Sequence, residues 1–176
     1  MGNLFHEWVE RRATTGAGTA VPLFDLDPEV VDPEREELDA ESSLPALIEQ
    51  FERSRWAELR PVAVELEVSI PFAGRRLVCK LDAVYRSDDG AGARYEVVDW
   101  KSGRPPRDDA ERSTRLLQLD LYRHAYAQWA GLDPACIDVT LFYVAEGQEL
   151  RGGPQRSLAE LEELWRAAEA AMRVDE

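Results

Sequence analysis

Two short segments of the sequence contain residues whose types and spacing could do chemistry. One contains Asp82, and the other contains Asp99 and Lys101 in the run Val98-Asp99-Trp100-Lys101. Residues two apart in a strand share a face, so Asp99 and Lys101 are expected to project to the same side. If Asp82 lies on the preceding strand of a hairpin, it can approach Asp99, because directly opposed side chains are about 5 Å apart.

Two carboxylates at that separation repel each other unless a cation lies between them, and Mg²⁺ prefers carboxylate oxygens and water as ligands. A neighbouring ammonium group could orient or help deprotonate an attacking water and stabilise charge on a phosphate. The three residues therefore allow a metal-assisted phosphodiester hydrolase. They could equally form an ordinary surface ion pair of little energetic value, and the motif alone leaves both interpretations open.

The segments around these residues have the alternation of strands. Period-two patterns predict strands over 62–70, 76–86 and 94–101, with turns between them, and these three strands are expected to form an antiparallel meander. A loop containing Gly103, Pro105 and Pro106 precedes a long helix predicted over 110–130. The apolar run 137–144 predicts a fourth strand, which can lie parallel to the third because a helix connects them.

Three further helices are expected from the spacing of apolar residues. The first covers the start of the chain, the second is capped by Ser42 or Ser43 and runs to about Leu59, and the last is capped by Ser157. Their buried stripes are predicted to be Phe5, Trp8, Val9 and Arg12 in the first and Leu158, Leu161, Leu164 and Trp165 in the last. The order predicts an α/β fold with a mixed central sheet, an antiparallel meander plus a parallel strand, flanked by helices.

Composition limits the functional classes. The chain has 176 residues, the size of one domain, and a net charge of −14, which argues against an ordinary basic nucleic-acid-binding face. Because phosphate contacts dominate such affinity, this domain alone is not expected to hold DNA tightly, and a partner domain would have to deliver the strand. No run of about 18 apolar residues and no secretory signal occur, so a cytoplasmic protein without membrane contact is expected.

Only two cysteines occur, Cys79 and Cys136, and both lie in apolar stretches. They are interpreted as reduced core residues of a cytoplasmic protein, although a disulfide between them remains the less favoured alternative. Two cysteines are too few for a four-cysteine zinc or iron–sulfur site.

Several separated motifs resemble one known family. Asp82 followed by Val98-Asp99-Trp100-Lys101-Ser102-Gly103 resembles the "D…VVDYKTG" signature of RecB-like PD-(D/E)XK nucleases. The segment 117–122 resembles the Gln-x-x-x-Tyr motif of the helix that follows in that family, with Gln118 and Tyr122 on one helical face. The start of the chain, Gly2-Asn3-Leu4-Phe5-His6, resembles the family's N-terminal helix, whose histidine is a metal ligand.

This resemblance implies a restriction-endonuclease-like PD-(D/E)XK core with a Mg²⁺ or Mn²⁺ site. It assigns the metal to His6, Asp82, Asp99 and the carbonyl of Trp100, the activation or positioning of water to Lys101, and a supporting role to Gln118 and Tyr122. The family also has an acidic residue on the strand before the aspartate. Glu67 matches that position best and would complete the metal shell; Glu65, on the same strand face, is the alternate.

The chain most resembles the C-terminal nuclease domain of actinobacterial UvrD/RecB-type helicase–nucleases of the AdnA/AdnB sort. This likeness implies one nuclease domain over 1–176, taken from a larger protein and made of an N-terminal helix over 1–14, an acidic linker over 15–41 and a catalytic core over 62–144. It implies a deoxyribonuclease that cuts single-stranded DNA fed by a helicase motor during double-strand break repair. The expected partners are DNA, the motor domains and a second helicase–nuclease subunit.

The chain departs from the family pattern at several positions. Lys80 replaces the usual glycine two residues before Asp82, where its ammonium would contact phosphate or point to solvent, and Trp100 replaces a tyrosine. The cysteines that bind an iron–sulfur cluster in some relatives are missing, so a cluster-free member is expected, and no phosphate-binding loop for an ATPase occurs.

Two other interpretations stay open. The first is a PD-(D/E)XK scaffold without catalysis that guides DNA or contacts proteins. The second is an unrelated acidic adaptor domain with chance motifs, which predicts that His6 and Asp99 lie far apart.

Overall fold

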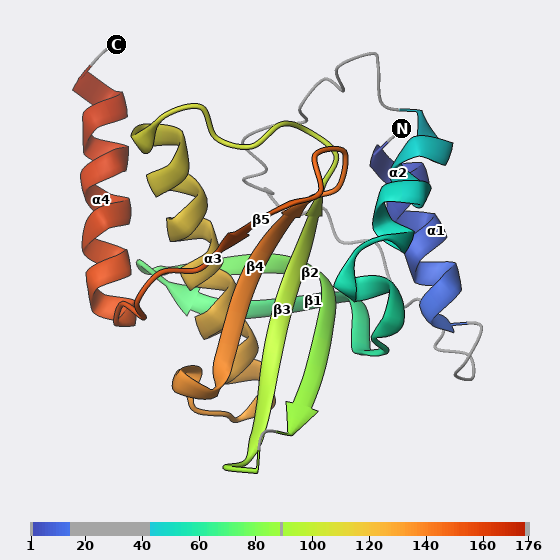
Figure 1. Cartoon of the computed structure of the whole chain (residues 1–176). Coiled ribbons are helices and arrows are strands. Elements are labelled where there is room, and N and C mark those ends of the chain that lie inside the picture. The colour runs from blue at the N-terminus through green and yellow to red at the C-terminus, as the bar shows by residue number, and fades with distance from the viewer. Residues whose placement is uncertain (1, 15–42, 89, 175–176) are drawn as a thin grey trace.

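A five-stranded mixed sheet forms the centre of the molecule, as shown by a computed structural model that describes residues 2–14, 43–88 and 90–174 (Figure 1). Its strands are β1 (Pro61–Phe72), β2 (Arg75–Asp88), β3 (Ala93–Lys101), β4 (Ile137–Tyr143) and β5 (Gln148–Arg151), in the order β1-β2-β3-β4-β5. The helices are α1 (Gly2–Thr14), α2 (Leu44–Glu52), α3 (Asp109–Ala130) and α4 (Leu158–Val174), with short 3₁₀ turns at η1 (Arg55–Glu58) and η2 (Pro134–Cys136). The acidic linker predicted over 15–41 lies outside the described residues.

The sheet has one parallel pair, and its other pairs are antiparallel. β1, β2 and β3 form the predicted meander, and β4 lies parallel to β3 after the crossover through α3. These predictions are confirmed, and the chain has the α/β architecture of a mixed sheet flanked by four helices. The short edge strand β5, which pairs with β4, was not predicted. Its four residues include only one strongly apolar side chain, so its strand conformation depends on pairing rather than on its own pattern.

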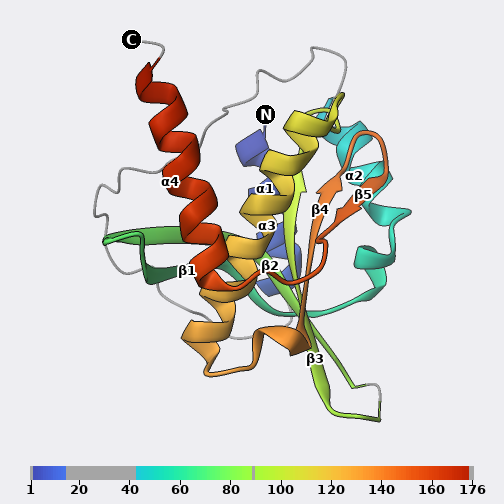
Figure 2. The same ribbon diagram turned by 90° about the vertical axis from the view of Figure 1, so that its left-hand side faces the viewer.

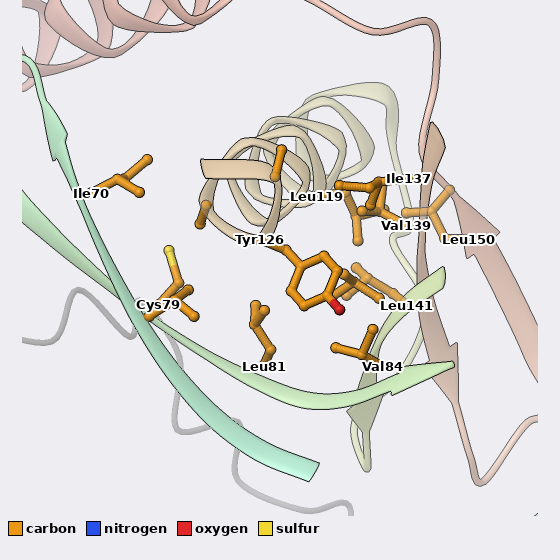
Figure 3. Close-up of a cluster of buried hydrophobic side chains, with 14 of the residues drawn as sticks. Ile70, Cys79, Leu81, Val84, Leu119, Tyr126, Ile137, Val139, Leu141 and Leu150 are labelled. Atoms are coloured by element: carbon orange, nitrogen blue, oxygen red, sulfur yellow. The ribbon is translucent and has the colours of Figure 1, made fainter. Parts of the chain in front are cut away.

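The helices cover the two faces of the sheet separately. Figure 2 shows α3 and α4 side by side on one face, with α1 on the far side of the sheet. Between α3 and the sheet lies the first core, drawn in Figure 3, in which Leu119 and Tyr126 of α3 pack among strand side chains. Its buried members are Val68, Ile70, Cys79, Leu81, Val84, Val97, Leu119, Ala125, Tyr126, Ala127, Ile137, Val139, Leu141, Tyr143 and Leu150.

The second core, on the opposite face, is rich in aromatic residues and holds α1, α2 and η1. Phe51 of α2 packs against both α1 and the sheet. Its ring centroid lies 5.9 Å from that of Phe5 of α1 and 5.3 Å from that of Trp100 of β3. The buried members are Phe5, Val9, Leu47, Phe51, Trp56, Ala83, Tyr85, Val98, Trp100, Phe142 and Val144. Burial of Phe5 and Val9 confirms these two members of the predicted stripe of α1, whereas Trp8 is half-buried and Arg12 is exposed. The buried pair fixes the neighbouring residue His6 against the sheet.

Two helix predictions need correction. α2 ends at Glu52 rather than near Leu59, because the chain turns at Ser54, whose hydroxyl donates a 2.6 Å hydrogen bond to the Phe51 carbonyl, before the 3₁₀ turn that buries Trp56. In α4, Leu164 is 46% exposed rather than inward. Leu161 is the centre of the buried stripe, and Leu164 lies on the side of it opposite to Trp165.

The long helix α3 is fixed in rotation by a buried ion pair. The guanidinium of Arg123 donates to Asp120 Oδ1 at 2.5 Å and to the Ile137 carbonyl of β4 at 3.0 Å, and both side chains are buried. Arg156, before α4, donates to the other Asp120 oxygen at 2.9 Å. Because Asp120 lies between Gln118 and Tyr122 in sequence, this network also sets where those two side chains point.

The two cysteines have the character expected from the sequence. Cys79 and Cys136 are free, Cys79 is buried in the first core and Cys136 is half-buried beside it. Among the described residues, no helix is both long enough and apolar enough to cross a membrane.

Candidate active site

The candidate site lies where two strands of the sheet change sides. On β1, Val64 packs against the second core and Leu66 against the first, although side chains two apart on a regular strand share a face. β2 makes the same change between Leu81 and Ala83. The cause on β1 is Glu65, whose φ of 49° lies in the left-handed region that side chains other than glycine rarely adopt. Such backbone outliers are concentrated at functional sites.

Glu65 and Asp82 lie at this change of side, and α1 brings a histidine to them. His6 Nδ1 is 3.3 Å from Asp82 Oδ1 and 3.5 Å from Glu65 Oε1. Each of the three residues offers a ligand atom within 4.8 Å of the other two, a spacing that suits one metal ion. An imidazole with two carboxylates is a donor set that fits Mn²⁺ and accommodates Mg²⁺.

Asp99 and Lys101 enter the site from the end of β3. Lys101 Nζ lies 3.0 Å from Asp99 Oδ2, so the two side chains share a face as predicted. The regular β2–β3 ladder ends at Ala83 and Val98, and beyond it the Trp100 N–H donates to Asp82 Oδ2 at 2.7 Å. Asp82 is thereby held between His6 on one side and β3 on the other.

The charges of Asp82, Asp99 and Lys101 favour the binding of a cation. Burial raises the pKa of Asp99, the negative charge of Asp82 raises it further, and Lys101 only partly offsets both, so that it reaches about 6. Lys101 Nζ lies 3.0 Å from Asp99 Oδ2, and the pKa of Asp99 stays raised in spite of this contact. A bound divalent cation would lower the cost of keeping Asp99 ionised, since it would screen the two carboxylates from each other.

His6 and Lys101 hold positive charge in the absence of a metal. Burial lowers the pKa of His6, but hydrogen bonds to Asp82 and Glu65 and their negative charges raise it to about 10. Burial likewise lowers the pKa of Lys101, and so does the positive charge of Arg115. The negative charge of Asp99 and the hydrogen bond that Lys101 donates to Asp99 raise this pKa, and the net shift is upward. Metal binding through the imidazole would therefore release a proton.

Lys80 contacts the site as well. Its exposed side chain forms an ion pair with Glu65, and the hydrogen bond that the ammonium donates to that carboxylate raises the pKa of Lys80. Burial raises the pKa of Glu65, but hydrogen bonds from His6 and Lys80 lower it below its usual value. Lys80 thus neutralises the auxiliary carboxylate in the metal-free protein, a role not anticipated from the sequence.

Gln118 and Tyr122 face this group from α3. Gln118 Nε2 donates to the Tyr122 hydroxyl at 2.7 Å, the pairing expected for positions one helical turn apart. Burial raises the pKa of Tyr122, and the negative charges of Asp99 and Asp82 raise it further. Their supporting role stays a prediction, as does the Trp100 carbonyl as a ligand.

The structure sets Glu67, the preferred auxiliary acid, apart from this group. Glu67 is exposed on β1 opposite Lys80, whereas its alternate Glu65 contacts His6. The prediction assumed uninterrupted alternation, under which Glu65 and Glu67 share a face. The left-handed backbone at Glu65 breaks that alternation, and no feature of the local sequence, such as a glycine, signals it.

The two glutamates make a matched test of this placement. Glu65→Gln is expected to weaken Mn²⁺ binding by about tenfold or more, because it removes one charged oxygen ligand and leaves Lys80 without its partner. Glu67→Gln removes the same charge two residues away and should bind Mn²⁺ as the unmodified chain does. Isothermal calorimetry of both variants measures the difference; equal losses, or a loss only in Glu67→Gln, would show that the assignment of Glu65 is wrong.

The fold and the site together define a class of protein: an α/β domain with an aspartate and a lysine at the end of its third sheet strand and further acids on the two strands before it. The chain matches the family model of the PD-(D/E)XK nuclease superfamily over residues 1–174, and it belongs to that superfamily. The superfamily consists generally of nucleases that use divalent metals, which indicates a nuclease-like domain here. A comparison with curated proteins finds no match for this chain.

Proposed function

We propose that this chain is a Mg²⁺- or Mn²⁺-dependent deoxyribonuclease domain that hydrolyses phosphodiester bonds of single-stranded DNA. The observation that carries the proposal is the convergence of His6, Glu65, Asp82 and Asp99 with Lys101, from α1, β1, β2 and β3. Burial and the charge of Asp82 raise the pKa of Asp99 even beside Lys101, so this pair of carboxylates costs folding free energy and a functional reason for the arrangement is expected.

In this mechanism His6, Glu65, Asp82 and Asp99 hold the ion, with the Trp100 carbonyl as a further ligand. A divalent ion bound there supplies Lewis-acid activation of water and neutralises charge on the phosphate. Lys101, held beside Asp99, orients the attacking water and stabilises the negative charge that develops on the phosphate oxygens. The hydrogen-bonded pair Gln118 and Tyr122 keeps these groups in place from the helix side.

The biological setting is proposed from the family resemblance and the charge. The motifs resemble those of RecB-like enzymes, above all the nuclease domain of AdnA/AdnB-type helicase–nucleases. The net charge of −14 favours a domain to which DNA is delivered over one that captures it alone. We therefore propose a domain of a larger cytoplasmic helicase–nuclease, joined to motor domains and to a second subunit, that acts in double-strand break repair.

Two alternative interpretations, an unrelated adaptor domain and a non-catalytic scaffold, are less well supported. The unrelated adaptor domain is wrong, because the chain belongs to the PD-(D/E)XK superfamily and because His6 lies close enough to Asp99 for its charge to lower the pKa of that carboxyl. A non-catalytic scaffold is disfavoured by the presence of Asp82, Asp99 and Lys101 together, since the fold does not need a buried pair of acids.

The direct test is cleavage of an end-labelled single-stranded oligonucleotide by the full chain. Fragments are expected with Mn²⁺ and with Mg²⁺, none with EDTA, and fewer from a blunt duplex of the same sequence, since a motor would normally unwind it. The control is Asp138→Asn, an exposed acid on β4 far along the strand from Lys101, which should cut as well as the unmodified chain. Absence of cleavage with either ion would contradict the proposal and favour the scaffold.

A further inference from the structure

Two carboxylates of the site each turn one oxygen toward His6 and have the other oxygen held by a different group. Glu65 Oε1 is 3.5 Å from His6 Nδ1, and Asp82 Oδ1 is 3.3 Å from the same nitrogen. The second oxygen of Asp82 accepts a 2.7 Å hydrogen bond from the Trp100 N–H, and the second oxygen of Glu65 forms an ion pair with Lys80. Each carboxylate therefore offers an ion beside His6 one oxygen rather than two.

Lys80 holds Glu65 from the neighbouring strand. In the register of β1 and β2 it lies opposite Glu67, yet it forms an ion pair with Glu65, the residue with the left-handed backbone. The side chain of Lys80 is 65% exposed and that of Glu65 is 17% exposed, so the ammonium lies on the solvent side of the carboxylate. Lys80 can keep this contact when an ion binds, because the ammonium and the ion use different oxygens of Glu65.

The number of oxygens that a carboxylate offers matters more to some divalent ions than to others. Ca²⁺ takes about six to eight oxygen ligands and accepts a carboxylate through both oxygens. Mg²⁺ is smaller, requires nearly octahedral coordination and keeps several of its waters, and Mn²⁺ is also found at octahedral oxygen sites. A carboxylate limited to one oxygen therefore costs Ca²⁺ a ligand that the two smaller ions do not need.

We propose that Lys80 determines which divalent ion the site prefers: by pairing with the outer oxygen of Glu65, it keeps Glu65 a one-oxygen ligand and disfavours Ca²⁺ relative to Mn²⁺ and Mg²⁺. This inference rests on the proposed metal-dependent function and adds discrimination between ions to it. Lys80 is a positioning residue, since it acts through Glu65 and supplies no ligand atom. The glycine that the family pattern usually has at this position could not make the contact.

The positive charge of Lys80 has a second effect, which the test must separate from positioning. An ammonium near the site repels every divalent ion, and this repulsion depends on charge and distance rather than on the kind of ion. Loss of the charge alone would therefore raise the affinities for Mn²⁺ and Ca²⁺ by similar factors. Only a change in their ratio reports the number of oxygens that Glu65 offers.

The test measures dissociation constants at fixed ionic strength, for Mn²⁺ by calorimetry and for Ca²⁺ by competition with Mn²⁺. Lys80→Met keeps the stem of the side chain and removes the ammonium, and we expect the ratio Kd(Ca²⁺)/Kd(Mn²⁺) to fall about tenfold. Lys80→Arg keeps a cationic donor and should keep most of the ratio. The matched control is Arg76→Met, an exposed site on the same strand where Arg76 donates to the Ser69 hydroxyl, and it should leave the ratio unchanged.

The outcomes separate the two claims. If the unmodified chain binds no Mn²⁺, the proposed metal-dependent function is overturned and the role of Lys80 with it. If the unmodified chain binds Mn²⁺ and Lys80→Met changes both constants by the same factor, in either direction, only the Lys80 assignment is overturned. A ratio that falls as far in Lys80→Arg would overturn it too. If Lys80→Met does not fold, Lys80→Gly takes its place: a lower ratio supports the assignment, and an unchanged ratio overturns it.

Discussion

Asp99→Asn is expected to lower kcat/KM for metal-dependent DNA cleavage by about a thousandfold or more. The substitution keeps the shape of the side chain but removes the charged oxygens beside Lys101 and Asp82, and an amide binds a divalent ion poorly. Steady-state cleavage of a labelled oligonucleotide measures the effect, and Asp138→Asn on the exposed side of β4 is the matched control. A loss of less than tenfold would show that Asp99 is not part of the metal site.

The same variant should be more stable than the unmodified chain when no metal is present. The pKa of Asp99 in the folded chain is about 6, above the ordinary value of 3.8, so between these values the folded state binds more protons than the unfolded state. The free energy of unfolding of the unmodified chain therefore falls as pH rises through this window and stays lower above pH 6. Asn carries no charge, so thermal unfolding in EDTA should show a higher Tm for Asp99→Asn at pH 7, with the difference vanishing near pH 4. A lower Tm at pH 7 would contradict this account.

Lys101→Met is expected to lower kcat by about a hundredfold or more while leaving Mn²⁺ affinity within a few-fold. Lys101 contacts Asp99 but contributes no ligand atom, and its raised pKa keeps the ammonium charged at neutral pH. In the proposed mechanism it therefore acts on the water and the phosphate and not on the ion. Paired kinetics and calorimetry separate these effects, with Arg166→Met, an exposed cation on α4 that pairs with Glu162, as the control. Equal loss of metal binding and kcat would contradict the division of roles.

Much of the fold could be predicted because its signals are local. Alternation gave the three strands of the meander, and the helix between the third and fourth strands implied their parallel pairing, which the structure confirms. What failed depended on tertiary context. The strand β5 exists through its pairing with β4, and the exposure of Leu164 depends on which part of α4 faces the sheet.

The site could be predicted partly from strand geometry and partly from the family resemblance. The shared face of Asp99 and Lys101 follows from strand geometry, but the approach of His6 to Asp82 was expected only from the family resemblance. Local physics gives no reason for a helix at the start of the chain to meet the second strand, since the aromatic packing of Phe5 and Phe51 is nonlocal.

The choice of Glu65 over Glu67 could not be made from sequence at all. The stretch around them alternates cleanly, so nothing in it indicates a residue with positive φ.

Calorimetric titration of Mn²⁺ into the unmodified chain and into Asp99→Asn tests the central claim most directly. The account predicts one saturable binding event in the unmodified chain, with release of a proton from His6 that appears as a dependence of the heat on the buffer, and loss of that event in Asp99→Asn. No binding to the unmodified chain at millimolar Mn²⁺, or equally tight binding to Asp99→Asn, would contradict a carboxylate metal centre formed around Asp82 and Asp99.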